Sequence, residues 1–303
     1  MRGLISALLF AFLLMSCSEE EEVGKTVNKP VEILLSVNSF TKNGAGIPAT
    51  TDIGTEEEQR IDNLYVFLFS DSDTKSYYID DDFSEGAWTA EKIVLKLTQK
   101  EAATRNVYIV ANCAAIKTKL DAVNTIDDLN AVFSELSLPW SPELTTPILM
   151  VGNKNSHNFE TNNQLNKISL KRVLAKLQLH VNLSTDQQDV KSAYKYRFVN
   201  FDKATYVIKP NLKPADLVSS DWYSLTEVDE KGGKVTSFTI ETYLNESDVK
   251  GTAIEVKIPG KGSSLLPPPE FGDESHRLFL PDRIIRNDFY LYDISFEEQQ
   301  TKQ

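Results

Sequence analysis

The sequence holds few of the residues on which disulfide scaffolds, metal sites and nucleic-acid surfaces depend. It has two cysteines and three histidines among 303 residues, and its net charge is −12. Two cysteines cannot build a disulfide framework, and the three histidines show no spacing typical of metal ligands. An acidic chain also lacks the clustered Lys and Arg that phosphate binding requires. We therefore expect no metal, no cofactor and no nucleic-acid partner, and we rank an enzyme last among the possible functions.

Long apolar runs are also absent, apart from one near the N-terminus. Arg2 precedes an apolar run over Leu4–Leu14, which is shorter than the roughly 20 residues of a transmembrane helix. Ser16 then stands directly before Cys17. This arrangement resembles the lipobox of bacterial lipoproteins, in which the cysteine becomes the acylated N-terminus and anchors the protein. We expect a signal peptide over residues 1–16, cleavage between Ser16 and Cys17, and lipid on Cys17. An ordinary signal peptide with a coincidental cysteine is the alternative.

An acidic run, Glu19–Glu22, follows the cysteine. It resembles the acidic signal that sends some lipoproteins to the outer face of the outer membrane. A block of like charges also repels itself and stays extended, so the same run suits a solvated tether. We assign residues 17–30 to this tether and expect the mature chain at the cell surface, held to the outer membrane by its lipid.

The remaining chain is long enough for two domains of about 140 residues each, and most of it has the pattern of short strands. Val31, Ile33, Leu35 and Val37 alternate with other residues, as in a half-buried strand. The polar stretch from Asn38 to Gln59 is typical of a long loop. Further strands are predicted over 61–69, 93–97, 107–111, 194–201, 205–208, 238–244, 253–258, 277–280 and 289–296.

One helix and one turn are also predicted. Thr125 and Asp128 form a capping-box pattern, and apolar residues at helical spacing continue to Leu136. Gly232 and Gly233 are typical of a tight turn. Many short strands separated by turns favour antiparallel β-sandwiches, so the predicted fold class is all-β with one or two short helices.

The segment 167–183 changes its pattern part-way. Ile168 and Leu170 occupy even positions, whereas Ala175 and Leu177 begin an apolar series at odd positions. A change of phase turns the buried face to the other side, so one strand could leave one core and enter another. We place a domain boundary here, between residues 31–174 and 175–303. A bulge within one domain would give the same signal.

Cys113 and the acidic residues from Asp71 could be a reactive thiol and a calcium site, but the sequence around them supports neither. Cys113 follows the apolar run 107–111 and is expected to be a buried, inert thiol. Asp71 and Asp73 begin like a calcium loop, but Lys75 occupies a ligand position and Ser76 stands where such a loop needs glycine.

Five stretches occur in an informative order along the mature chain: Ile61–Phe69, Arg105–Asn112, Ile148–Gly152, Leu170–Leu179, and Arg286-Asn287 followed by Tyr290. Together with the lipobox, they resemble the fimbrillin family, the major and minor lipoprotein subunits of type V pili. The resemblance implies two tandem transthyretin-like β-sandwich domains. It also implies assembly by strand exchange, in which a protease cuts after the first strand and a strand from another subunit replaces it. The leaving strand here would be Val31–Val37.

The sequence departs from the family in two places. The family's processing site is an arginine soon after the first strand, whereas this chain offers Lys42 and, at the edge of the next strand, Arg60. Stalk subunits also carry a donor segment after the Arg-Asn-x-x-Tyr strand, whereas this sequence ends soon after it. A subunit without a donor suits a fimbrial tip, and a subunit that is never cut suits a basal anchor.

The predicted function is therefore a tip or accessory subunit of a surface fimbria, released into the fimbria after processing. Its partners would be other fimbrial subunits, and a host protein or glycan. A basal anchor is one alternative. Another is a stand-alone lipoprotein that binds glycans through exposed aromatic side chains: Trp88, Trp140, Trp222 and Tyr223.

Overall fold

The computed structural model describes residues 28–44, 47–89, 91–138, 140–183, 194–225, 227–258 and 274–296. Ser16, Cys17 and nearly all of the acidic tether lie outside these residues, so the signal peptide and the lipid stay predictions. No helix within the described ranges is long and apolar enough to cross a membrane.

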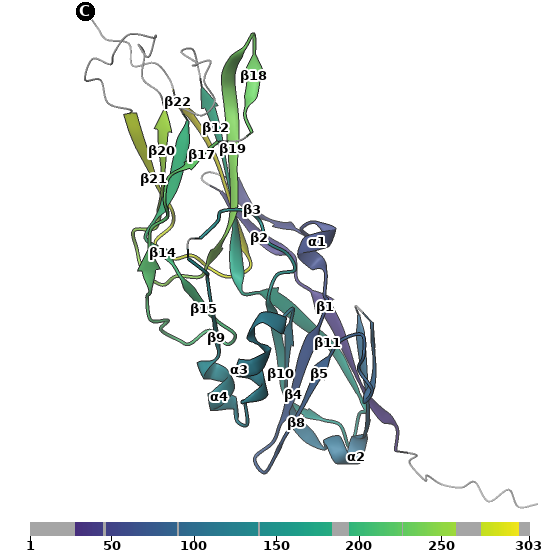
Figure 1. Cartoon of the computed structure of the whole chain (residues 1–303). Helices are drawn as coiled ribbons and strands as arrows, with labels where there is room; N and C mark the ends of the chain where they lie inside the picture. The colour runs from purple at the N-terminus through teal and green to yellow at the C-terminus, as the bar shows by residue number, and fades with distance from the viewer. Residues whose placement is uncertain are drawn as a thin grey trace, which may run out of the picture.

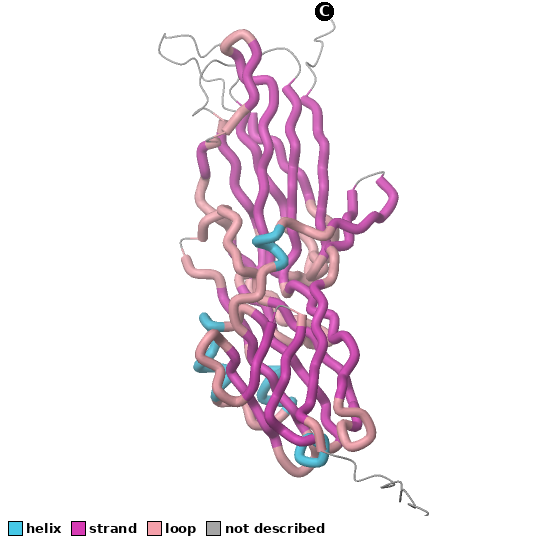
Figure 2. Tube along the Cα trace, turned by 90° about the vertical axis from the view of Figure 1, so that its right-hand side faces the viewer, coloured by secondary structure: helices cyan, strands magenta, loops and turns pink. Residues whose placement is uncertain are grey.

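The molecule is elongated, with two β-rich halves end to end and short helices at the side of one half (Figures 1 and 2). The predicted all-β class with β-sandwich layers is confirmed. Among the described strands three pairs run parallel, which antiparallel layers alone would not contain, and such pairs need partners from distant parts of the sequence.

One half contains eight strands in a continuous hydrogen-bonded order. The link between β10 and β11 consists of only two residue pairs, so the strands can fold over into two layers. Gly152 fits at this crossing, since a Cβ there would lie 2.6 Å from Ile168 Cγ2 and 2.7 Å from Ser169 O. Apolar side chains from both layers enclose the first core. The strands, in sheet order, are β5 (Thr74–Ile79), β4 (Leu64–Phe69), β8 (Thr104–Ala111), β10 (Met150–Asn158), β11 (Gln164–Arg172), β1 (Pro30–Val37), β7 (Lys92–Thr98) and β6 (Gly86–Thr89).

The other half packs a six-stranded and a four-stranded sheet around a second core. The six-stranded sheet is β18 (Asp229–Lys231), β19 (Lys234–Asn245), β12 (Leu174–Leu183), β22 (Asp288–Phe296), β2 (Phe40–Gly44) and β3 (Ile47–Asp52). The four-stranded sheet is β17 (Tyr223–Ser224), β13 (Lys195–Val199), β20 (Ala253–Ile258) and β21 (Glu274–Phe279). Two short pairs complete the strands: β14 (Phe201–Asp202) with β16 (Leu217–Val218), and β15 (Ala204–Tyr206) with β9 (Phe133–Glu135).

The change of phase near residue 173 corresponds to a change of core. Ile168 and Leu170 on β11 belong to the first core, whereas Ala175 and Leu177 on β12 belong to the second. The chain also crosses between the halves much earlier, because β2 pairs with β22. The division into domains 31–174 and 175–303 stays a prediction.

The predicted loop from Asn38 to Gln59 is wrong in most of its length. It contains the hairpin β2–β3 and the helix α1 (Glu56–Gln59). The partner of β2 is β22, more than two hundred residues away, so local composition could not reveal this pairing. Thr55 and Glu58 form a capping box at α1, and Gly54 supplies a positive φ of 80° before it.

The helix predicted from Thr125 is present but shorter than expected. The capping box of Thr125 and Asp128 is confirmed, and the helix α4 (Ile126–Ala131) ends before Val132. The next residues, Phe133–Glu135, form β9 because their backbone pairs with β15. The other short helices are α2 (Gln99–Ala102), η1 (Ala114–Ile116) and α3 (Lys117–Asp121). The predicted turn at Gly232 and Gly233 is confirmed, with positive φ at both residues.

A buried carboxylate organises the loop that connects β15 to β16. Asp248 Oδ2 lies 2.6 Å from Lys209 Nζ and accepts a hydrogen bond from Lys213 N, while Asp248 Oδ1 lies 2.6 Å from Arg283 Nη2. Burial by itself would raise the pKa of Asp248, but these hydrogen bonds outweigh it and lower the pKa to about 2.

We expect Asp248→Asn to destabilise the protein in a pH-dependent way. A carboxyl with a depressed pKa stabilises the fold above its ordinary pKa of 3.8, and this contribution disappears as the pH falls toward 2. Denaturant titrations should show a loss of about 2 kcal/mol in unfolding free energy at pH 7 and almost none near pH 2. Asp282→Asn, which breaks an exposed pair with Lys250, is the control and should change little. A loss at pH 2 as large as at pH 7 would contradict this role.

Candidate functional site around the first strand

The first strand lies in the middle of its sheet. β1 pairs in parallel with β11 on one side and antiparallel with β7 on the other. Ile33, for example, faces Leu165 on β11 and Ile93 on β7. The first described strand is therefore enclosed by two neighbours rather than added at an edge.

The side chains of β1 alternate as the sequence predicts. Val31 and Ile33 are fully buried in the first core and Leu35 is 2% exposed, whereas Val37 packs against the rim of this core. Without β1, the sheet would have a groove lined by apolar side chains and by unpaired backbone groups on β7 and β11. Such a groove is a template for another strand.

The polar contacts of β1 are confined to its exposed face. Glu32 lies 3.0 Å from Lys92 Nζ and accepts a hydrogen bond from Gln164 Nε2. The hydrogen bond from Lys92 lowers the pKa of Glu32 despite some desolvation. Because these groups are partly solvated, their contribution to stability is small, and burial of the apolar side chains holds the strand in place.

The end of β1 leads directly to a buried guanidinium. Arg172 is fully buried, and its three nitrogens donate to three carbonyl oxygens: Nη1 to Asn38 O (2.7 Å), Nε to Glu58 O (3.0 Å) and Nη2 to Ile53 O (3.3 Å). Its guanidinium also stacks on Phe40, 3.9 Å from the ring centroid. Burial lowers the pKa of Arg172. All three carbonyl groups belong to the segment between β1 and β4.

Asn287 completes this arrangement from the other end of the chain. It adopts a positive φ of 63°, which asparagine tolerates better than most residues. Its Oδ1 accepts from Arg172 N (3.2 Å), and its Nδ2 donates to Ser39 O (2.6 Å). The Tyr290 hydroxyl accepts a hydrogen bond from Ile285 N and so closes the turn at Arg286 and Asn287, and burial raises the pKa of Tyr290. Asn287 and Tyr290 of the Arg-Asn-x-x-Tyr pattern thus connect the start of β22 to the end of β11 and to the residues just after β1.

The Glu58 carboxylate joins α1 to the half that contains the second core. It lies 2.9 Å from Lys176 Nζ and accepts from the Tyr243 hydroxyl (2.7 Å) and from Thr55 N (2.7 Å). Burial acts to raise the pKa of Glu58, but the hydrogen bonds outweigh it and lower the pKa. We call Arg172, Asn287 and Glu58, with their bonded carbonyl groups, the Arg172 cluster.

The two candidate cleavage residues differ in their surroundings. Lys42 lies inside β2, between β3 and β22, where it pairs with Thr50 and Phe289. Arg60 follows α1 outside any strand, with a side chain that is 43% exposed and paired with Glu57. A protease needs an accessible, extended backbone, so Arg60 is the more reachable of the two.

The backbone at Arg60 is nevertheless held in place. Asn112, with a positive φ of 59°, donates from Nδ2 to Arg60 O (2.9 Å) and to Ile148 O (2.7 Å), and its Oδ1 accepts from Asp62 N (2.8 Å). The peptide after Arg60 must therefore leave the Asn112 side chain before it can enter a protease. Asn112 is the last residue of a stretch that resembles the family, but its role was not apparent from sequence.

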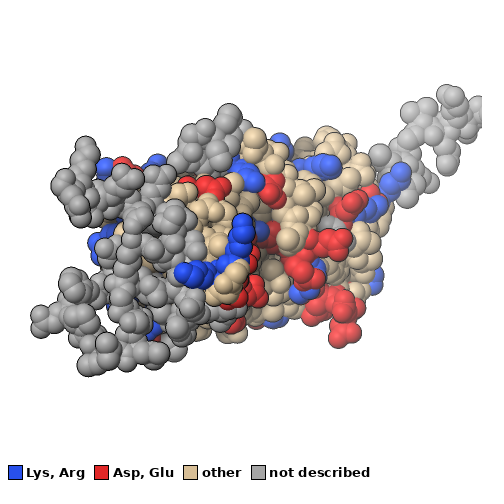
Figure 3. All heavy atoms as spheres, turned by 90° about the horizontal axis from the view of Figure 1, so that it is seen from above, with Lys and Arg blue, Asp and Glu red and all other residues tan. Residues whose placement is uncertain are grey.

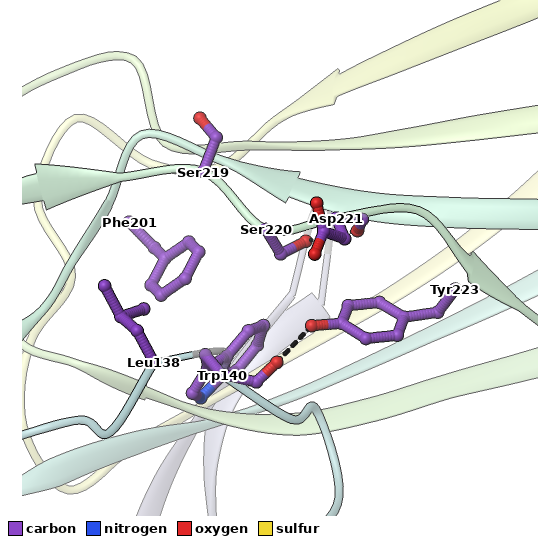
Figure 4. A pocket seen from close by; sticks show the side chains of 7 residues that line it. All are labelled: Leu138, Trp140, Phe201, Ser219, Ser220, Asp221 and Tyr223. Atoms are coloured by element: carbon purple, nitrogen blue, oxygen red, sulfur yellow. Dashed lines mark hydrogen bonds between the residues drawn. The ribbon is translucent and has the colours of Figure 1, made fainter.

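The four aromatic residues considered for glycan binding are mostly committed to packing. Trp88 packs on the first core, and Trp140, only 9% exposed, packs against Phe201. Figure 4 shows Trp140 and Tyr223 at a small cavity of about 110 Å³, with the Tyr223 hydroxyl donating to Trp140 O. Trp222 alone contacts charged side chains.

The other chemical candidates have structural partners. Burial raises the pKa of the Cys113 thiol to about 12, in agreement with an inert buried cysteine. Asp73 pairs with Arg105, so this acidic turn serves an ion pair. No group of three or more His, Cys, Asp or Glu side chains in the described part of the chain could hold a metal ion.

Two family models of fimbrial subunits divide the chain between them. Residues 33–172 match the family model of the major fimbrial subunit protein FimA, and residues 173–295 match the C-terminal model of the minor fimbrium tip subunit MfA4. The minor fimbrium tip subunit MfA4 of Porphyromonas gingivalis is 39% identical over 327 aligned residues, which cover 96% of this chain and 98% of the relative. The chain belongs to the MfA4 family of fimbrial subunits. This is a family of structural subunits rather than enzymes.

Solved structures share the fold of this family. The tip fimbrial protein Mfa3 from Porphyromonas gingivalis superposes with a TM-score of 0.51 at 14% identity, covering 89% of this chain and 96% of Mfa3. A candidate cell adhesion protein from Bacteroides eggerthii gives the same TM-score at 17% identity, covering 88% of this chain and 86% of its own. At these identities the likeness concerns the fold alone.

We expect Asn112→Gly to accelerate proteolysis after Arg60. Glycine accepts the positive φ, while the loss of three side-chain hydrogen bonds makes local opening easier by more than about 1.4 kcal/mol. Limited digestion with trypsin, followed by N-terminal sequencing, should reveal an N-terminus at Ile61 at least about tenfold faster than in the parent chain. Asn200→Gly, which has a similar positive φ of 55° elsewhere, is the control. Equal rates for the two variants would rule out the proposed restraint.

Proposed function

We propose that this chain is a tip or accessory subunit of a bacterial surface fimbria, and that it receives a donor strand in the position of β1. The single observation that carries the proposal is the enclosure of β1 between β7 and β11 with three alternating side chains in the core. The 39% identity to a minor fimbrium tip subunit supports the tip position.

The physical reason for exchange is the groove that β1 would leave. A donor strand with apolar residues at alternate positions would refill the sites of Val31, Ile33 and Leu35 and would restore the backbone hydrogen bonds. The subunit would then be complete only when joined to its neighbour. If the donor strand enters the groove while β1 leaves, no state with an open groove needs to persist. A stepwise exchange is therefore favoured over complete loss of β1 before the donor binds.

Processing at Arg60 would release more than one strand. The freed segment would include β1, the hairpin β2–β3 and α1, and with them all three carbonyl groups that accept from Arg172. A buried guanidinium without acceptors is costly, so the donor segment must supply new carbonyl groups or admit water. We infer that β1, β2, β3 and α1 leave together, and that the hydrogen bonds of the Arg172 cluster break in the same step.

Before processing, lipid on Cys17 would hold the chain at the outer membrane, and the cut would free it for the fimbria. The Asn112 restraint on Arg60 favours a second candidate, a basal anchor that is never cut and keeps its lipid. A host protein or glycan as the adhesion partner belongs to the tip proposal.

The proposal predicts that Ile33→Ala destabilises the subunit before assembly but not after it. Loss of this fully buried side chain should lower the unfolding free energy of the monomer by about 2–5 kcal/mol. The weakened strand should leave more readily, so the variant should enter sheared fimbriae of the host bacterium faster than the parent chain. Once β1 has gone, the thermal stability of the assembled fimbria should be unchanged.

Leu165→Ala is the matched control, because this 2% exposed residue lines the same core from β11, which stays. It should destabilise both the monomer and the assembled subunit. If Ile33→Ala weakens the assembled fimbria as much as Leu165→Ala does, β1 remains in place and strand exchange at this site is wrong.

A further inference from the structure

The outer face of the four-stranded sheet concentrates positive charge in an otherwise acidic chain. Lys195 on β13 faces Lys257 on β20, and Arg197 faces Glu255, which in turn faces Arg277 on β21. Among the described side chains on this face of the three strands, four cations thus stand around one carboxylate, although the whole chain has a net charge of −12. Acidic side chains gather instead at the right of Figure 3, on the side of α1. We call these five residues, with Trp222 and Phe279, the basic face.

The two arginines of the basic face are held by one buried carboxylate. Glu255 is 5% exposed and accepts from Arg197 Nε (2.5 Å) and from Arg277 Nε (2.7 Å). The arginine side chains themselves remain 34% and 45% exposed. A guanidinium has five N–H donors, so each arginine keeps donors for an anion from solution.

Aromatic rings fix the cations further and add an apolar surface. Trp222 lies 4.7 Å from the Arg197 guanidinium and 4.6 Å from Lys257 Nζ, measured to the ring. Phe279, two residues after Arg277 on the same face, is 61% exposed, and its ring centroid lies 5.8 Å from the Arg277 guanidinium. The face thus combines oriented cations with an aromatic ring open to solvent.

We propose that the basic face binds an anionic oligosaccharide with sulfate or carboxylate groups. Those groups match the arginine and lysine donors, and the C–H face of a sugar ring matches the exposed ring of Phe279. A long polyanion such as nucleic acid suits the site less well, since the acidic remainder of the chain repels it. The face lies in the half of the molecule that does not hold β1. This inference does not rest on strand exchange.

Calorimetric titration of the purified full chain with a size-defined heparin oligosaccharide tests the proposal. Lys195→Gln/Lys257→Gln should weaken binding about tenfold, whereas Lys167→Gln/Lys171→Gln should change it less than about twofold. The second pair removes the same charge from exposed lysines on β11 in the other half. Phe279→Ser should weaken binding of the oligosaccharide severalfold without changing the response to inorganic sulfate. Circular dichroism melts check that every variant is folded.

Three outcomes would overturn the proposal: no binding of heparin by the parent chain, equal losses in the two lysine pairs, or tighter binding of a short DNA duplex at the same face. An unchanged affinity for the oligosaccharide in Phe279→Ser would also contradict it, because the face would then bind anions in general rather than sugars. None of these results bears on the exchange of β1, which Ile33→Ala tests separately.

Discussion

The buried guanidinium of Arg172 is the interaction on which the junction of the two halves depends. Its side chain donates to three backbone carbonyl groups of the segment between β1 and β4. The Arg172 backbone N–H donates to the side chain of Asn287, which stands just before β22. An arginine can bridge so many groups because its charge is permanent and its donors are fixed in a plane. The cost of burying this charge is offset only while these acceptors are present. The N-terminal segment, β11 and β22 therefore form one cooperative unit.

In the proposed strand exchange, this dependence would extend to the first strand. β1 is held mainly by apolar burial, and the Arg172 side chain, at the end of the neighbouring strand β11, binds the carbonyl group just after β1 together with two carbonyl groups near α1. A chain that keeps this segment keeps the first core closed and the guanidinium satisfied. A chain that loses it exposes an apolar groove and an unsatisfied guanidinium together, and both favour capture of a new strand. In this proposal, the contacts of β1 and of Arg172 that stabilise the free subunit would also, once broken, drive the binding of a donor strand.

Local signals in the sequence predicted the elements that depend on neighbours in the chain. The alternation of Val31, Ile33 and Leu35, the capping box at Thr125 and the change of phase before Ala175 all reflect short-range periodicity, and the structure confirms them. Features made by distant partners were missed. The hairpin β2–β3 forms because β22 accepts it, and α4 stops early because β15 pairs with the next residues. The restraint of Arg60 by Asn112 spans fifty-two residues and has no local signature.

A disulfide between β1 and β11 would test most directly whether β1 must leave. Ser36 and Ser169 are partners on adjacent parallel strands with hydroxyl oxygens 3.5 Å apart, and strand neighbours lie within the range that a disulfide spans. The variant Ser36→Cys/Ser169→Cys should be excluded from fimbriae while oxidised and should be incorporated at the parent level after reduction. Equal incorporation of the oxidised and reduced forms would contradict the account, because it would mean that the subunit joins the fimbria with β1 in place.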